Sequence, residues 1–198
     1  MPPLLPGSVS YGRRLSQLAE EHPESTAIVF AGPDGRERRL SWAELDTAST
    51  AGAHLLLAIM SAEPSAGDRI AIALPSGPEH FIATYAAWKL GACAVPLRWD
   101  LPEWERHRVL EVARPSVVIG DWPADPGGAP VVSTRDLLAA VIPIGAPPLP
   151  DRLPFPARAV ASGGSTGMPK LIVTLLPGAA APGRYFETGV LYPSLQQG

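Results

Sequence analysis

Residues suited to chemistry are concentrated in one glycine-rich loop, Ser162-Gly-Gly-Ser-Thr-Gly-Met-Pro-Lys170. Its glycines reach backbone angles that other residues adopt only at a cost, so neighbouring backbone N–H groups can converge on an anion. Hydroxyl groups add further donors, and Lys170 adds a positive charge on a long side chain, which suits a phosphate. The pattern therefore predicts a phosphate-binding loop with the candidate ligands Ser162, Gly163, Gly164, Ser165, Thr166, Gly167 and Lys170.

The spacing within this loop excludes two common phosphate-binding motifs. A Walker loop places Lys directly after its last glycine and Ser or Thr directly after the lysine. Here Met168 and Pro169 separate Gly167 from Lys170, and Leu171 follows the lysine. A dinucleotide fingerprint needs Gly-x-Gly-x-x-Gly between a strand and a helix, whereas the segment after this loop has the character of a strand. A glycine-serine turn without chemistry remains the plain alternative.

The elements that must position the loop are predicted from apolar runs and helix signals. Strands are expected at residues 26–31, 36–40, 69–74, 93–97 and 116–120, and two more at 158–161 and 171–174 flank the loop. Helices are expected at 11–21, from 42 onwards, from 78 to about 90, and after Asp100 as far as Ala113. The alternation of apolar strands with helices predicts an α/β fold, with a layered, mostly parallel sheet flanked by helices. It ends in a β-hairpin around the phosphate loop.

Several helix starts carry specific signals. Ser10 is expected to cap the first helix, and Ser41 with Glu44 forms a capping box before the second. Pro78 suits the first position of the third helix, and Asp100 has box-like spacing before the fourth. The apolar face of the third helix is predicted to comprise Phe81, Ile82, Tyr85 and Trp88. One interpretation of Trp88, Trp99 and Trp104 is a platform for stacking a ligand. Helical spacing instead favours Trp88 and Trp104 as core residues.

The proline distribution predicts the domain organisation. Of 24 prolines, nine lie between residues 121 and 156, which marks that stretch as a long connector. We therefore expect an α/β subdomain at 1–120, a Pro/Gly-rich connector at 121–156, and the phosphate-loop hairpin with its tail at 157–198. All three belong to one incomplete domain.

Composition excludes several classes of protein. A net charge of −3 without a clustered basic face argues against nucleic-acid binding. A single cysteine, Cys93, allows no internal disulfide and is expected to be a small buried residue. The histidines His22, His54, His80 and His107 lack metal-ligand spacing, and we expect each to have a surface or core role. No charge-free run reaches the about 20 apolar residues of a membrane span, so a soluble cytoplasmic protein is predicted.

Residues 162–170 resemble the phosphate loop of the adenylate-forming superfamily, which includes acyl-CoA synthetases, peptide-synthetase adenylation domains and luciferases. The pattern of that family is Thr/Ser-Ser/Gly-Gly-Thr/Ser-Thr-Gly-x-Pro-Lys, and this chain matches it at every position. Segments 40–45, 67–75 and 87–97 also resemble the family's first long helix, an early strand and a helix–strand pair. The resemblance covers residues 11–174.

This resemblance implies an enzyme that activates a small-molecule carboxylic acid with ATP as an acyl-adenylate and transfers it to CoA. The implied cofactors are ATP, Mg²⁺ and CoA, and the loop would hold the β- and γ-phosphates. The amino-acid sequence of residues 162–172 is similar to that of acid–CoA ligases acting on bile acids or fatty acids.

The chain also departs from the family. It contains no Tyr-Gly-x-Thr-Glu adenine motif, Thr-Gly-Asp ribose motif, hinge or catalytic lysine, so no catalytic residue is identified. We expect the isolated chain not to complete catalysis and to expose apolar surface that favours association. The associated molecule would be a partner chain with the missing C-terminal part or a second copy. The alternatives are one chain of a split ligase, a non-catalytic binding module, and an unrelated nucleotide-binding protein.

Overall fold

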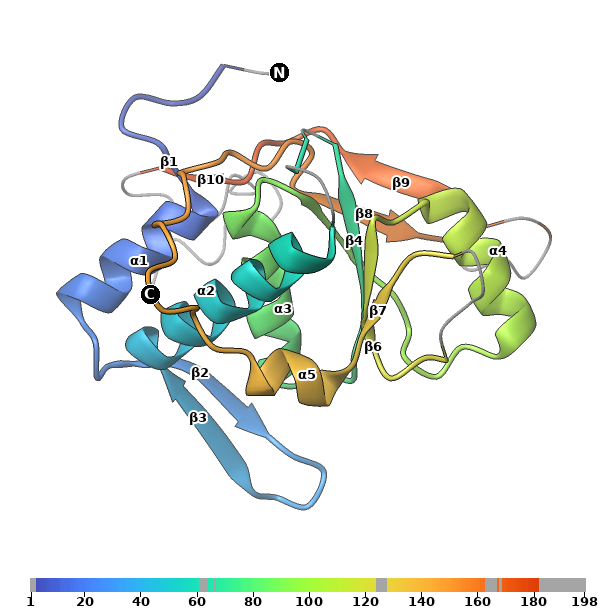
Figure 1. Cartoon of the computed structure of the whole chain (residues 1–198), viewed down its shortest axis with the longest axis horizontal. Helices are drawn as coiled ribbons and strands as arrows, with labels where there is room; N and C mark the ends of the chain where they lie inside the picture. The colour runs from blue at the N-terminus through green and yellow to red at the C-terminus, as the bar shows by residue number, and fades with distance from the viewer. Residues whose placement is uncertain are drawn as a thin grey trace, which may run out of the picture.

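Six strands form the central sheet of the computed structural model, which describes residues 3–60, 64–65, 67–123, 128–162, 167 and 169–181. The strands lie in the order β7-β6-β4-β5-β8-β9 (Figure 1). All neighbouring strands pair in parallel except β8 and β9, which are antiparallel. Their bounds are β4 (Arg69–Ala73), β5 (Cys93–Pro96), β6 (Val117–Gly120), β7 (Val131–Val132), β8 (Arg158–Ala161) and β9 (Leu171–Thr174). The predicted mostly parallel α/β sheet is confirmed.

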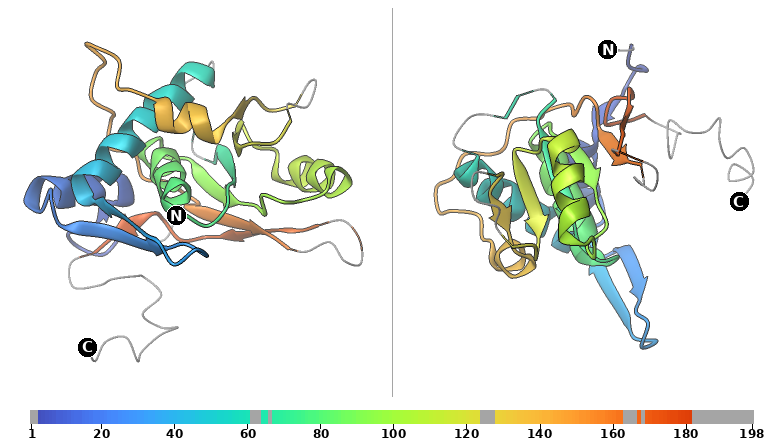
Figure 2. Two further views of the ribbon diagram at one scale, coloured as in Figure 1. Left: turned by 90° about the horizontal axis from the view of Figure 1, so that it is seen from below. Right: turned by 90° about the vertical axis from the view of Figure 1, so that its right-hand side faces the viewer.

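Helices cover both faces of this sheet. Four of them, α1 (Tyr11–Glu21), α2 (Trp42–Ile59), α3 (Pro78–Lys89) and α5 (Thr134–Ala139), contribute to one core, whereas α4 (Glu103–Ala113) packs on the opposite face. Figures 1 and 2 show α4 across the sheet from α2 and α3. Because side chains alternate along a strand, Ile70 and Ile72 enter the first core while Ala71 and Ala73 enter the second. Burial on both faces explains why β4 is apolar at every position from Ile70 to Ala73.

Two small sheets complete the fold. The hairpin of β2 (Thr26–Ala31) and β3 (Glu37–Ser41) protrudes from the body, as Figures 1 and 2 show. An ion pair between Arg38 on this hairpin and Glu79 joins it to the first turn of α3. Burial raises the pKa of Glu79, but the hydrogen bond and charge of Arg38 outweigh it and lower the pKa overall. The second small sheet pairs β1 (Val9–Ser10) with β10 (Ala179–Ala180).

The helix signals at Ser10 and at Ser41 with Glu44 were confirmed. The Ser10 hydroxyl accepts from the Arg13 N–H at 3.0 Å, and both hydrogen bonds of the capping box between Ser41 and Glu44 are present. The prediction for Asp100 was wrong, since Pro102 occupies the cap of α4 without a side-chain hydrogen bond.

The predicted apolar faces were wrong at two aromatic positions. Phe81 and Trp104 are 46% and 59% exposed, although both were expected in the core. Small residues take the place of Phe81, because Ala83, Ala86 and Ala87 are fully buried where α3 packs closely on its neighbours. Within residues 121–156, the structure has β7 and α5, for which no element had been predicted.

The predicted burial of Cys93 is confirmed, since the residue has no exposed surface. Burial raises the pKa of its thiol to about 11, partly opposed by the charge of Arg69. We expect iodoacetamide at pH 8 to alkylate the folded chain at least about 100-fold more slowly than the urea-unfolded chain, because the thiolate is the nucleophile. Mass spectrometry of quenched samples measures both rates, and equal rates would contradict the assignment.

The same shift makes stability depend on pH in a defined direction. An unfolded thiol loses its proton near pH 8.5, whereas the folded thiol of Cys93 keeps it until about pH 11. The contribution of this group to stability is therefore complete below about pH 8.5 and falls as the pH rises through this window.

Candidate functional site

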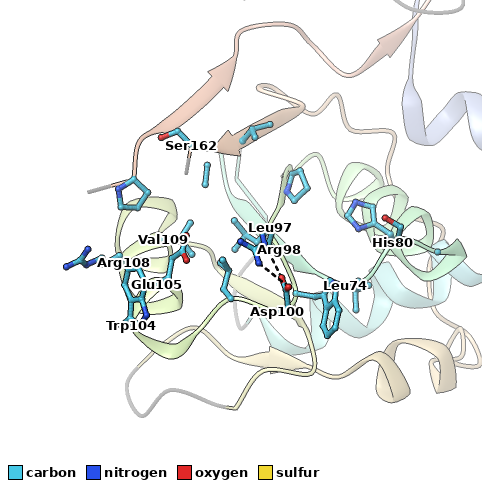
Figure 3. Close-up of a pocket in the computed structure, with 18 of the residues that line it drawn as sticks. Leu74, His80, Leu97, Arg98, Asp100, Trp104, Glu105, Arg108, Val109 and Ser162 are labelled. Carbon is cyan, nitrogen blue, oxygen red and sulfur yellow. Dashed lines mark hydrogen bonds and ion pairs between the residues drawn. The ribbon is translucent and has the colours of Figure 1, made fainter. Parts of the chain in front are cut away.

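A cleft of about 850 Å³ opens beyond the carboxyl ends of β4, β5 and β8 (Figure 3). After β4 the chain continues into α3 on one face of the sheet, whereas after β5 it continues into α4 on the other face. The two connections therefore diverge from neighbouring strands and leave a crevice between them. Ligands of open parallel sheets bind at such a point.

The glycine-rich loop borders this cleft. The Ser162 N–H donates to the Lys170 carbonyl at 2.8 Å, and the Lys170 N–H donates to Ser162 Oγ at 2.9 Å. These two hydrogen bonds close the base of the loop where β8 ends and β9 begins. Ser162, Gly167 and Pro169 line the cleft, so the hairpin presents the loop at its edge.

The structure describes three of the seven predicted phosphate ligands. Ser162 and Gly167 lie on the cleft, and a Cβ added at Gly167 would meet no atom within 4 Å. Lys170 is exposed beside Ser162 at the base of the loop. The other four, Gly163, Gly164, Ser165 and Thr166, lie outside the described residues, so the phosphate role of the set stays a prediction.

His80 is a cleft residue for which only a surface or core role had been expected. It lies in the first turn of α3 and faces the cleft from the side opposite α4 (Figure 3). Burial lowers the pKa of its imidazole, and a hydrogen bond with the Leu74 backbone partly opposes this. Burial therefore favours the neutral form of this imidazole. Its position just after the carboxyl end of a parallel strand is the signal that could have identified it.

Charged groups at the cleft occur in opposed pairs. The Arg98 Nε and Nη2 atoms donate to the two carboxylate oxygens of Asp100, each at 3.0 Å. The hydrogen bond from Arg98 lowers the pKa of Asp100. On α4, Glu105 and Arg108 also line the cleft, and the Arg108 guanidinium lies 5.3 Å from the centre of the Trp104 ring. The cleft thus has polar groups with little net charge.

The remaining lining of the cleft is apolar for the most part and includes aromatic side chains. Four aromatic side chains come from separate parts of the fold, namely Phe30 on β2, Phe81 on α3, Trp99 after β5, and Trp104 on α4. Three of them, Phe81, Trp99 and Trp104, are 46%, 55% and 59% exposed. Exposed aromatic side chains around a concave surface are typical of a binding site.

Metal-binding clusters and membrane-spanning helices are both absent from the part of the chain that the structure describes. That part of the chain contains no cluster of three or more His, Cys, Asp or Glu side chains suited to a metal ion. None of its helices combines the length and apolarity that a membrane crossing requires. A Mg²⁺ ion that accompanies a nucleotide is held largely by phosphates and water, so it needs no such cluster.

Comparison with known proteins gives one consistent family. The sequence model of the AMP-binding enzyme family matches residues 15–179. A salicyl-AMP ligase / salicyl-S-ArCP synthetase from Mycobacterium tuberculosis is 30% identical over 80% of this chain and 32% of its own length. A crotonobetaine/carnitine–CoA ligase from Citrobacter koseri is 30% identical over 52% of this chain and 19% of its own length.

Solved structures agree with this match. The N-terminal subdomain of NpsA from Klebsiella oxytoca, in complex with 3-hydroxybenzoyl-AMSN, superimposes with a TM-score of 0.65 at 26% identity. The match covers 83% of this chain and 40% of that chain. The chain thus spans less than half the length of each of these three relatives.

Proposed function

The chain belongs to the AMP-binding enzyme family, and on that premise we propose that residues 162–170 bind the β- and γ-phosphates of ATP in an enzyme that activates a carboxylic acid. The family forms acyl-adenylates, and this chain corresponds to the N-terminal subdomain of such an enzyme. Transfer of the acyl group to CoA is part of the proposal. The complete activity would also require parts of these relatives that this chain does not span.

The position of the loop is the observation that supports this function best. The paired hydrogen bonds between Ser162 and Lys170 fix both ends of the loop at the carboxyl edge of a parallel sheet, beside the cleft. Because the Ser162 oxygen accepts from the Lys170 N–H, the proton of its hydroxyl remains able to donate to an anion. The exposed ammonium group of Lys170 carries the compact positive charge that a phosphate requires.

The chemical role of these residues is electrostatic. Backbone N–H groups, hydroxyls and the Lys170 ammonium would stabilise the negative charge that develops on the departing pyrophosphate. Bound Mg²⁺ would supply further neutralisation of phosphate charge. The chain's own contribution is to orient the polyphosphate relative to the cleft, where the rest of the ligand would lie.

An acid–CoA ligase is the form of this function that we favour. The amino-acid sequence of residues 162–172 resembles that of acid–CoA ligases, and a CoA ligase is among the relatives. The relatives also include a salicyl-AMP ligase, so the acyl acceptor is the part of the proposal with least support. A binding module without chemistry and one chain of a split ligase are the alternative proposals.

Substitution of Lys170 tests the phosphate role. We expect Lys170→Ala to weaken binding of Mg²⁺–ATP about 10-fold or more, because it removes a charged donor from the anion. Isothermal titration calorimetry on the full 198-residue chain measures the affinity. Arg158→Ala is the matched control, since it removes one exposed positive charge from the same hairpin at its far end. An unchanged affinity in Lys170→Ala, or an equal loss in both variants, would contradict the proposal.

A further inference from the structure

We propose that residues 146–150, Ala-Pro-Pro-Leu-Pro, form a docking segment for a partner protein whose groove is lined by aromatic side chains. Such grooves bind Pro-x-x-Pro segments in the polyproline II conformation, and Pro147 and Pro150 have this spacing. This proline segment lies in the connector between α5 and β8, and none of its residues lines the cleft. The proposal is therefore independent of the proposed function.

The first argument is that the covalent structure of the proline segment favours polyproline II. A proline ring fixes its own φ at about −65°, and it restricts the residue before it to extended conformations. At least one of these two restrictions acts at every position from 146 to 150. Within the described part of the chain, no backbone N–H donates to the carbonyls of Pro147, Pro148 or Pro150. Because polyproline II has no internal hydrogen bonds, these carbonyls remain available to a partner.

The second argument is the exposure of the prolines. All three prolines of the segment are exposed, and only Leu149 packs on the core that α1, α2, α3 and α5 form. Figure 1 shows the chain after α5 passing α2 and α1 before it returns to β8. A pocket of about 410 Å³ opens between residues 148–152 and these two helices. A partner's side chain therefore has room on this side of the segment as well.

The third argument is the apolar surface just before the proline segment. Val141 and Ile142 are 76% and 44% exposed, and Ile144 is fully exposed. Leu138, near the end of α5, is also exposed. Large apolar side chains that gather at one place on a surface are typical of a site of protein interaction. A partner that bound the prolines could cover these side chains too.

The fourth argument is that the chain is attached to the body of the fold on both sides of the proline segment. Before it, the Leu137 side chain of α5 is buried in the core. After it, the Arg152 guanidinium donates to the Pro64 carbonyl at 2.7 Å, and the Ser10 hydroxyl donates to the Asp151 carboxylate. A segment that is ordered before binding loses less conformational entropy when a partner engages it.

SH3 and WW domains test the proposal, because both bind proline-rich segments in grooves of this kind. A panel of purified domains of each kind is titrated against the 198-residue chain in isothermal titration calorimetry. We expect at least one domain to bind at a single saturable site, and its kind then identifies the type of groove. If no domain binds, the segment is only a rigid connector and the proposal is overturned.

Two variants locate the binding site. Pro147→Ala and Pro150→Ala should each weaken binding of that domain about 10-fold, the scale on which truncation of an interface anchor reduces affinity. Pro33→Ala is the matched control, because it makes the same change at an exposed proline between β2 and β3. It should leave the affinity unchanged. An unchanged affinity in both segment variants, or an equal loss in all three, would refute the assignment. Matched urea midpoints exclude unfolding as the cause.

Discussion

Replacement of Gly120 by alanine is expected to destabilise the fold by about 3 kcal/mol or more, from the combined cost of strain and overpacking. Gly120 ends β6 with a φ of +154°, directly beside Ala73 at the end of β4. A Cβ at this position would lie 2.5 Å from the Ala73 carbonyl oxygen. Because that oxygen belongs to the backbone of a central strand, it cannot move aside without separating the two strands.

Urea unfolding followed by circular dichroism measures this cost. Gly35→Ala is the matched control, because Gly35 has a φ of +76° and no neighbouring atom within 4 Å of the added Cβ. The control isolates the conformational cost, which is about 1 kcal/mol. If the two variants lose the same stability, the contact with Ala73 does not restrict the strand and the argument fails.

The second large effect is expected at Lys89, one of the few charged residues inside the fold. Its side chain is 7% exposed, and its Nζ atom lies 2.7 Å from the Asp46 carboxylate and 3.2 Å from Ser16 Oγ. These contacts join α3 to α2 and α1. Lys89→Met should cost about 3 kcal/mol, because it leaves the largely buried charge of Asp46 unpaired.

A double variant separates the charge effect from packing. Lys89→Met combined with Asp46→Leu removes both charges, so it should recover a large part of the lost stability. Arg14→Met breaks the exposed ion pair with Glu21 and should cost less than about 1 kcal/mol. Urea midpoints of the four proteins provide the comparison. A double variant less stable than Lys89→Met would show that the unpaired carboxylate is not the cause.

Features set by neighbouring residues could be predicted from the sequence. The capping box of Ser41 and Glu44 and the N-cap at Ser10 require atoms only three residues apart, and both were confirmed. Strands β4, β5 and β6 could be predicted because burial on two faces leaves a nearly unbroken apolar run. The hairpin of β8 and β9 around the loop was confirmed for a similar reason, since two short apolar runs flank a glycine-rich turn.

Features set by tertiary contacts could not be predicted in this way. One local competition also escaped prediction, because the guanidinium of Arg98, two residues before Asp100, binds both carboxylate oxygens that were expected to cap α4. Phe81 and Trp104 were expected inside, but apolar character alone cannot distinguish a core side chain from the wall of a cleft. His80 lies at the cleft because the start of α3 follows the carboxyl end of β4, and this position depends on the order of the strands.

Helix α3 connects the cleft with the buried ion pair. Its first turn carries His80 and Phe81 at the cleft, and its last residue is Lys89 in the buried ion pair. At about 1.5 Å per residue, roughly 14 Å of rigid helix separates these ends. A rotation or shift of α3 that follows a change at Lys89 is therefore transmitted to the mouth of the cleft. Ligand affinity and thermal stability would then be coupled, because both depend on the position of one helix.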